Sequence, residues 1–110
     1  MDILNKNIEI AKKIITSEVE KAGYRVDSII LFGSRARGDY KEGSDWDFFV
    51  VIDKNIFKED MKMILRNIRR RMALNNISND IVIKSKDIYK NQKNDTGFLS
   101  YYVNKEGVNI

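Results

Sequence analysis

The 110-residue sequence contains no cysteine and no histidine. Without cysteine the chain can form neither a disulfide framework nor a thiolate metal site. Without histidine it lacks the Ser-His and Cys-His nucleophiles, histidine-ligated zinc and an imidazole general base. Proline is also absent, and we find no low-complexity tract, internal repeat or linker. Any proton transfer in this protein therefore depends on carboxylates.

Long apolar runs are missing as well. No segment approaches the roughly 20 apolar residues that span a bilayer, and the N-terminal MDILNKNIEIAKK lacks the pattern of a signal peptide. Hydrophobic residues make up 43% of the chain and charged residues 33%, as in folded soluble domains. A chain of this length can bury one core. We therefore expect a single cytoplasmic domain, residues 1–110, without membrane contact.

Positive charge is in modest excess. Lysine and arginine number 20 against 16 acidic residues, which gives a net charge of +4. This balance suits nucleotides or an acidic partner, but a lysine-rich composition also produces it. Direct nucleic-acid binding therefore stays an open alternative that the charge alone favours little.

The spacing of apolar residues predicts the secondary structure. Stripes at helical spacing mark helices over residues 3–22 and 57–75. Runs that are apolar on both faces mark buried strands at Val26–Phe32 and Trp46–Ile52. The chain then continues with a strand at Asp80–Lys84, a helical turn at Asp87–Lys93, a last helix capped by Asp95 or Thr96 and ended by Gly107, and a short strand at Val108–Ile110. This order predicts an α+β fold, a small mixed β-sheet backed by helices on one face.

Several side chains outside the motifs have ambiguous roles. The cluster Arg69-Arg70-Arg71 is interpreted as a solvated helix face, with phosphate or acidic-protein contact as the alternative. Tyr102 is assigned to the core. Three other tyrosines stay open between core and partner surface: Tyr40, Tyr89 and Tyr101.

The segment with most chemical meaning is GSRARGDYKEGSDWDFFVVID, residues 33–53. Strand alternation places Asp45 and Asp47 on one face, with Trp46 on the other. Two carboxylates aimed together suit a hard divalent cation, Mg²⁺ or Mn²⁺. We expect a metal site at this end of the sheet.

The glycine-rich part of this segment predicts an anion site beside the metal. Gly33 and Ser34 directly follow an apolar strand, where backbone N–H groups can converge on a phosphate, and the start of a following helix would add its dipole. Each feature taken singly has an ordinary explanation: a tight turn at Gly33, a helix cap at Ser34, or a solvated strand start at Asp45 and Asp47. Their combination between two apolar strands favours the functional interpretation.

The spacing of Gly33-Ser34, ten further residues and Asp45-x-Asp47 resembles the signature of the minimal nucleotidyltransferases, a branch of the DNA polymerase β-like superfamily. The resemblance covers most of the chain and includes the closing segment SYYVNKEGVNI. It implies a fold like the polymerase β palm. It also implies Mg²⁺-dependent transfer of a nucleoside monophosphate, AMP from ATP, to a hydroxyl group, because two metals held by shared carboxylates can drive such a displacement.

The resemblance also implies roles for acidic residues. Asp45 and Asp47 would be metal ligands. A third carboxylate on the following strand would bind metal and take the proton of the attacking hydroxyl. Asp80, which opens an apolar strand, is assigned this role, with Asp53 and Asp87 as weaker candidates.

For the triphosphate, the resemblance implies contacts from the glycine-rich turn. Gly33 and Ser34 would hold the β- and γ-phosphates through backbone N–H groups and the hydroxyl. Arg35 or Arg37 would add a cationic clamp, because a guanidinium matches phosphate oxygens in pairs.

The expected partner follows from the family as well. Larger relatives carry a second, helical domain for the acceptor, and this chain has none, which points to the short form paired with a separate HEPN toxin. The resemblance thus implies an antitoxin that adenylylates a tyrosine of that partner, in a homo- or hetero-oligomer. Two alternatives stay open: a non-catalytic antitoxin that neutralises its partner by occlusion, and an antibiotic-modifying enzyme whose acceptor pocket needs a dimer or partner.

Overall fold

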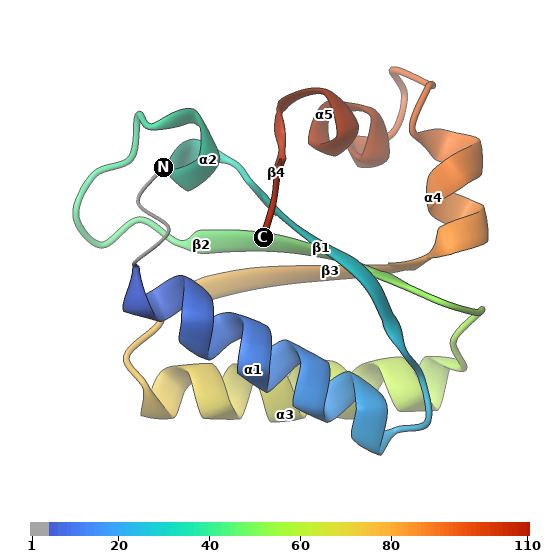
Figure 1. The fold of residues 1–110 in the computed structure, drawn as a ribbon, viewed down its shortest axis with the longest axis horizontal. Coiled ribbons are helices and arrows are strands. Elements are labelled where there is room, and N and C mark those ends of the chain that lie inside the picture. Colours follow the sequence, from blue (N-terminus) through green and yellow to red (C-terminus); the bar gives the residue numbers. More distant parts are fainter. Residues whose placement is uncertain (1–4) are drawn as a thin grey trace.

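The computed structural model describes residues 5–110, which form five helices and four strands (Figure 1). In chain order the elements are α1 (Lys6–Lys21), β1 (Val26–Phe32), α2 (Ser34–Arg37), β2 (Trp46–Ile52), α3 (Lys58–Leu74), β3 (Asn79–Ser85), α4 (Lys86–Gln92), α5 (Leu99–Glu106) and β4 (Val108–Asn109). Within these residues no helix combines the length and apolar character that crossing a bilayer requires.

The strands form one mixed sheet in the order β3-β2-β1-β4. β1 runs antiparallel to β2 and to β4, whereas β2 and β3 are parallel. The predicted α+β fold with a small mixed sheet is therefore confirmed. In this topology the C-terminal end of β1 meets the N-terminal ends of β2 and β3. We call this the acidic end of the sheet, defined by Gly33, Asp45, Asp47 and Asp80.

Helices cover both faces of the sheet. The pair α1 and α3 lies against one face, while α4 and α5 lie against the other (Figure 1). On the second face, Val103 of α5 and Tyr89 of α4 pack on Ile30, Phe49 and Val51. The expectation that helices back only one face is therefore wrong. The physical reason is that β1 and β2 are apolar on both faces, so leaving one face open would expose large hydrophobic side chains to water.

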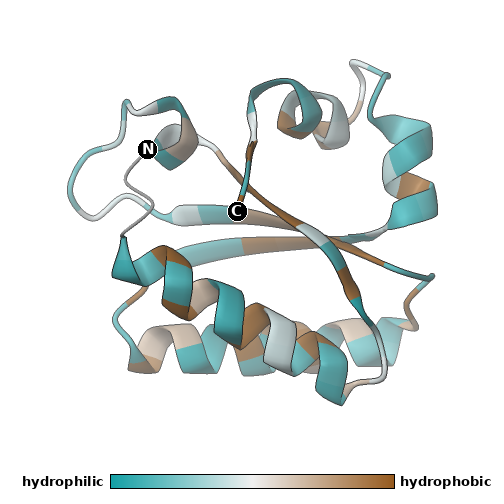
Figure 2. Cartoon of the chain, in the orientation of Figure 1, coloured by the Kyte–Doolittle hydropathy of each residue, from teal (hydrophilic) through white to brown (hydrophobic). Residues whose placement is uncertain are grey.

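The main core lies between the sheet and the first pair of helices. Figure 2 shows hydrophobic colour concentrated along the strands and in bands on α1 and α3. The buried side chains of this core include Ile15, Leu31, Phe48, Ile64 and Ile68. This core fixes the positions of β1 and β2, whose ends form part of the acidic end.

A partly buried ion pair joins the two helices of that face. Glu18 of α1 is only 5% exposed, and its Oε2 accepts hydrogen bonds from Nη1 of Arg71 at 2.8 Å and from Nζ of Lys21 at 3.2 Å. Burial opposes ionisation of Glu18, but the bonds from Arg71 and Lys21 outweigh it, so the pKa lies below its usual value. Arg71 is thus structural, whereas Arg69 and Arg70 are exposed, as expected for a solvated face.

Most predicted boundaries agree with the structure to within one or two residues. Residues 3 and 4 of the first predicted helix lie outside the described residues; α1 starts at Lys6, capped by the Asn5 side chain, which accepts from the Asn7 N–H at 2.9 Å. The predicted cap of the last helix is wrong. Phe98 occupies that position, while Asp95 accepts from the N–H of Gly97 at 2.9 Å in the preceding turn.

The assignment of Tyr102 to the core is also wrong. Its side chain is 48% exposed on α5. Only one face of this two-turn helix is buried. Val103 on this face packs on the sheet, and the hydroxyl of Ser100 donates to Oε1 of Gln92 in α4 at 3.4 Å. Tyr102 instead faces a groove beside the acidic end.

Candidate active site

Asp47 and Asp80 lie side by side at the acidic end. They are register partners in the parallel ladder of β2 and β3, so their side chains point to the same face of the sheet. On the other side of β2, Asp47 is opposite Phe32, the last residue of β1. Asp47 is therefore placed between the Gly33 turn and the second carboxylate.

The pKa of Asp47 is raised above its usual value of 3.8. Burial of this half-buried side chain is the largest cause, followed by the negative charges of Asp80 and Asp45. The positive charge of Arg37 acts in the opposite direction. Repulsion among three carboxylates means that a bound cation would be favoured here.

The Gly33 turn approaches Asp47 so closely that only glycine fits. Gly33 has a φ of +74°, a conformation that L side chains rarely adopt, and an added Cβ would overlap Oδ2 of Asp47. Its carbonyl accepts the N–H groups of Ala36 and Arg37, both at 3.1 Å, which closes the single turn of α2. The first residue of that turn, Ser34, is half-buried.

Asp45 is exposed and is held by Ser78, the residue just before β3. Its Oδ1 accepts a hydrogen bond from the hydroxyl of Ser78, and the N–H of Trp46 donates to the Ser78 carbonyl at 2.9 Å. Sequence reasoning missed Ser78. In the sequence Ser78 is marked only by its position two residues before Asp80. The pairing of β3 with β2 is what brings it beside Asp45.

The two arginines of the GSRARG turn have different surroundings. Arg35 donates to the carbonyl of Ser44 from Nη2 at 3.0 Å and from Nε at 3.3 Å, and it lies against two aromatic rings. Arg37 is exposed, contacts Asp39 at 3.4 Å through Nε, and influences the ionisation of Asp47. Arg37 is therefore the arginine free to turn toward a ligand near Asp47.

A groove of about 330 Å³ runs from the Gly33 turn to α5. Its walls include Phe32, Gly33, Arg37, Leu99, Tyr102 and Glu106. It extends the site toward α5, a helix far from Gly33 in the sequence. Sequence reasoning missed this wall because the pattern of α5 does not reveal which neighbour its outer face will meet.

The donor set at the acidic end fits a hard divalent cation. Asp45, Asp47 and Asp80 offer carboxylate oxygens, the ligands that Mg²⁺ and Mn²⁺ prefer. In residues 5–110, however, no three acidic side chains are already arranged as a metal cage, and Asp45 is turned toward Ser78. Binding would therefore require rotation of at least one carboxylate.

Asp53 and Asp87, the weaker candidates for the third carboxylate, lie at the opposite end of the sheet. They follow the C-terminal ends of β2 and β3, so the length of a seven-residue strand, about 20 Å, separates them from Asp45 and Asp47. Neither can share a metal ion with that pair. Asp53 accepts the N–H of Arg25 at 2.9 Å, and this bond is the main reason that its pKa is lowered.

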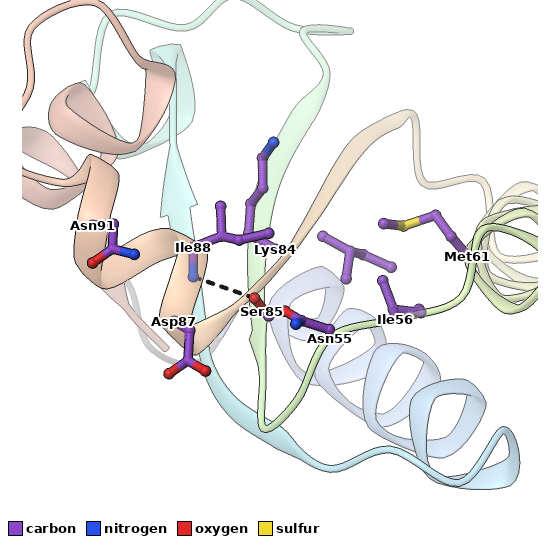
Figure 3. Close-up of a pocket in the computed structure, with 9 residues that line it drawn as sticks. Asn55, Ile56, Met61, Lys84, Ser85, Asp87, Ile88 and Asn91 are labelled. Carbon is purple, nitrogen blue, oxygen red and sulfur yellow. Dashed lines mark hydrogen bonds between the residues drawn. The ribbon is translucent and has the colours of Figure 1, made fainter.

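Asp87 lines a different cavity, of about 570 Å³, between the start of α3 and α4 (Figure 3). Asn55, Ile56, Met61 and Asn91 share its walls. The hydrogen bond drawn there, from the N–H of Ile88 to Oγ of Ser85 at 3.3 Å, caps α4. Apart from the rejected Asp87, none of the residues selected from the sequence lines this cavity.

Residues 12–110 match the family model described as Polymerase beta, Nucleotidyltransferase. Because the match spans most of the chain, the protein belongs to this nucleotidyltransferase family. Asp45, Asp47, Asp80 and the Gly33 turn all lie within the matched region.

Curated relatives come from Methanocaldococcus jannaschii. One, named "Putative protein adenylyltransferase MJ0141", is 40% identical over 65 residues, which cover 58% of this chain and 62% of that protein. A second with the same description, MJ1379, is 40% identical over 67 residues, covering 58% of this chain and 65% of that protein. The alignments thus span less than two thirds of these relatives.

Proposed function

We propose that this protein is a divalent-metal-dependent nucleotidyltransferase that transfers AMP from ATP to a hydroxyl group of a protein. The observation that carries the proposal is the meeting of two register-paired carboxylates with a glycine turn at one end of the sheet. Carboxylates can bind a divalent metal, and the backbone N–H groups of such a turn can bind phosphate. Nucleotidyl transfer needs both kinds of contact.

In the proposed reaction the acceptor oxygen attacks the α-phosphorus of ATP. The bond from that phosphorus to the oxygen bridging the β-phosphorus breaks, and pyrophosphate leaves. Asp80 accepts the proton of the attacking hydroxyl. Gly33 and Ser34 hold the leaving phosphates, and Arg37 neutralises part of their charge.

The proposed metal, Mg²⁺ or Mn²⁺, would be bound by Asp45, Asp47 and Asp80. When bound it would lower the pKa of the attacking hydroxyl and neutralise charge on the phosphates. The repulsion that raises the pKa of Asp47 supports this assignment, because a cation would relieve it.

The groove toward α5 supports a nucleotide rather than a bare phosphate as ligand. It begins at Gly33 and Arg37 and provides an apolar floor at Phe32 and an exposed aromatic ring at Tyr102. A nucleoside needs such a surface, since bases stack on aromatic side chains.

A protein acceptor is supported by the names of the M. jannaschii relatives, which describe protein adenylyltransferases. We extend the proposal to a tyrosine of a HEPN toxin, with this chain as its antitoxin, on the basis of the resemblance described above. The exposed hydrophobic side chains of Leu99 and Tyr102, which line the groove, and of the neighbouring Phe98 provide a surface for such a partner.

The proposal is tested with the Asp45→Asn, Asp47→Asn double variant. We expect the wild-type protein to bind ATP in calorimetric titrations with Mg²⁺ and to transfer label from α-labelled ATP to the co-expressed partner protein. The double variant should stay folded by circular dichroism and lose at least about a hundredfold in transfer rate, as removal of catalytic groups usually costs. If the double variant labels the partner normally, the proposal is wrong. If the wild type transfers no label and the double variant still neutralises the partner, the catalytic proposal is replaced by the non-catalytic antitoxin.

A further inference from the structure

Arg35 connects α2 to the loop that leads into Asp45. This loop, residues 38–45, has Gly38 and Gly43 near its ends, both at positive φ. Arg35 reaches it through the two hydrogen bonds to the Ser44 carbonyl, and the guanidinium carbon lies 4.3 Å from the ring centroid of Tyr40. The same carbon lies 4.4 Å from the ring centroid of Trp46, the first residue of β2.

These contacts occupy much of the guanidinium. The N–H groups at Nε and Nη2 donate to the Ser44 carbonyl, and two aromatic rings lie against the guanidinium. The Arg35 side chain is therefore fixed by the protein and is not directed at a ligand. The loop is also closed on itself: the N–H of Ser44 donates to the Lys41 carbonyl, and the N–H of Lys41 donates to Oγ of Ser44, both at 3.0 Å. Arg35 thus binds a preformed turn at the residue next to Asp45.

We propose that Arg35 is a positioning residue that sets the carboxylate of Asp45, and that it does not bind the triphosphate. Asp45 is then held from two directions. Arg35 fixes the peptide before Asp45 through the Ser44 carbonyl, and Ser78, just before β3, fixes the Asp45 side chain. The inference rests on the proposed function, because it takes Asp45 to be a metal ligand.

The matched pair of variants Arg35→Lys and Arg37→Lys distinguishes a positioning role at Asp45 from binding of the triphosphate. Both variants keep the positive charge, but lysine lacks the planar fork that holds the Ser44 carbonyl and stacks on rings. Circular dichroism first establishes that each variant is folded. Tyr40→Leu, which removes one exposed ring from the cluster, is a second variant with a smaller expected effect in the same direction.

Three readouts test positioning without requiring turnover. Hydrogen exchange follows the amides of Lys41, Ser44 and Trp46, the emission of Trp46 reports its own surroundings because it is the only tryptophan, and calorimetry measures binding of Mn²⁺ alone. For Arg35→Lys we expect exchange at these amides to be faster and Mn²⁺ affinity to be weaker by roughly tenfold, the size expected from losing charged hydrogen bonds. Trp46 emission should shift. Arg37→Lys should leave all three unchanged and weaken ATP binding.

The outcomes are separable from those of the proposed function. If Arg35→Lys leaves loop exchange, Trp46 emission and Mn²⁺ affinity unchanged but weakens ATP binding, Arg35 is a phosphate ligand and the inference is overturned. It is also overturned if the wild type binds no Mn²⁺. If the wild type binds Mn²⁺ but no ATP, the proposed function fails while the loop and metal measurements still decide the role of Arg35.

Discussion

The two ends of the sheet carry carboxylates in opposite electrostatic situations. At the acidic end, Asp47 has its pKa raised by burial and by the neighbouring charges of Asp80 and Asp45. At the opposite end, Asp53 has its pKa lowered, chiefly by the N–H of Arg25. The larger cavity, about 570 Å³ beside Asp87, also lies at the opposite end, compared with about 330 Å³ for the groove at Gly33.

This difference shows that charge left without compensation identifies the candidate site better than cavity size does. A protein gains nothing in stability from placing carboxylates against one another, so such an arrangement indicates a ligand that supplies the missing charge. The carboxylate of Asp53, in contrast, is already satisfied by the backbone. Three pairs of substitutions test the comparison, beginning with the largest expected effect.

Replacing the glycine at each end gives the strongest contrast. Gly33→Ala and Gly23→Ala both place a side chain at positive φ, +74° and +91°, and each should destabilise the fold by about 1–3 kcal/mol through backbone strain. Only at Gly33 does the new Cβ also overlap Oδ2 of Asp47, whereas nothing lies within 4 Å at Gly23. We expect AMP transfer and ATP binding to be lost in Gly33→Ala and kept in Gly23→Ala, measured below both unfolding temperatures. If the two variants had equal AMP-transfer activity, the Gly33 turn would not be part of the active site.

The third carboxylate is tested by Asp80→Asn against Asp87→Asn. Removing a general base typically lowers the rate about 10²- to 10⁴-fold, and we expect kcat for AMP transfer to fall within that range in Asp80→Asn. Asp87→Asn should leave kcat unchanged, because Asp87 lies at the opposite end of the sheet. The reverse result would mean that the cavity of Figure 3 contains the active site.

The smallest expected effect is on the unfolding temperature. Its sign differs between an Asp→Asn substitution at Asp47 and one at Asp53. Because the pKa of Asp47 is raised on folding, its ionisation disfavours the fold, so stability is lost as pH rises from the usual value of 3.8 through the raised value. Asp47→Asn should therefore unfold at a higher temperature than the wild type at pH 7. The lowered pKa of Asp53 has the opposite consequence: it contributes stability above 3.8 that is lost in acid, so Asp53→Asn should unfold at a lower temperature.

Thermal unfolding followed by circular dichroism between pH 3 and pH 7 checks both signs, and the differences between variant and wild type should shrink toward the acidic end of this range. Adding Mg²⁺ sharpens the test. A ligand that binds only the folded state raises the unfolding temperature, so Mg²⁺ should stabilise the wild type but not Asp47→Asn. A decrease in stability for Asp47→Asn at pH 7 would contradict the account of the acidic end.

Much of the fold follows from local sequence pattern. The strands Val26–Phe32 and Trp46–Ile52 were predicted with their observed bounds, because long apolar runs leave few alternatives. The two-residue period of a strand predicted that Asp45 and Asp47 point the same way. In the structure β2 begins at Trp46, and the Asp45 carboxylate accepts a hydrogen bond from Ser78. The same runs, apolar on both faces, already implied cover on both sides of the sheet, which the predicted architecture did not include.

The remaining features depend on contacts between distant segments, which no local pattern specifies. The sequence by itself determined which residues are acidic, which strand each one heads and where the glycine turn lies. Only the tertiary structure decided that Asp80 is the register partner of Asp47, while Asp53 and Asp87 lie a strand length away. It also separated Arg35 from Arg37 and brought Tyr102 to the groove. The physical reason is that pairing register and helix docking are set by packing of the whole core, whereas strand alternation is set by the backbone itself.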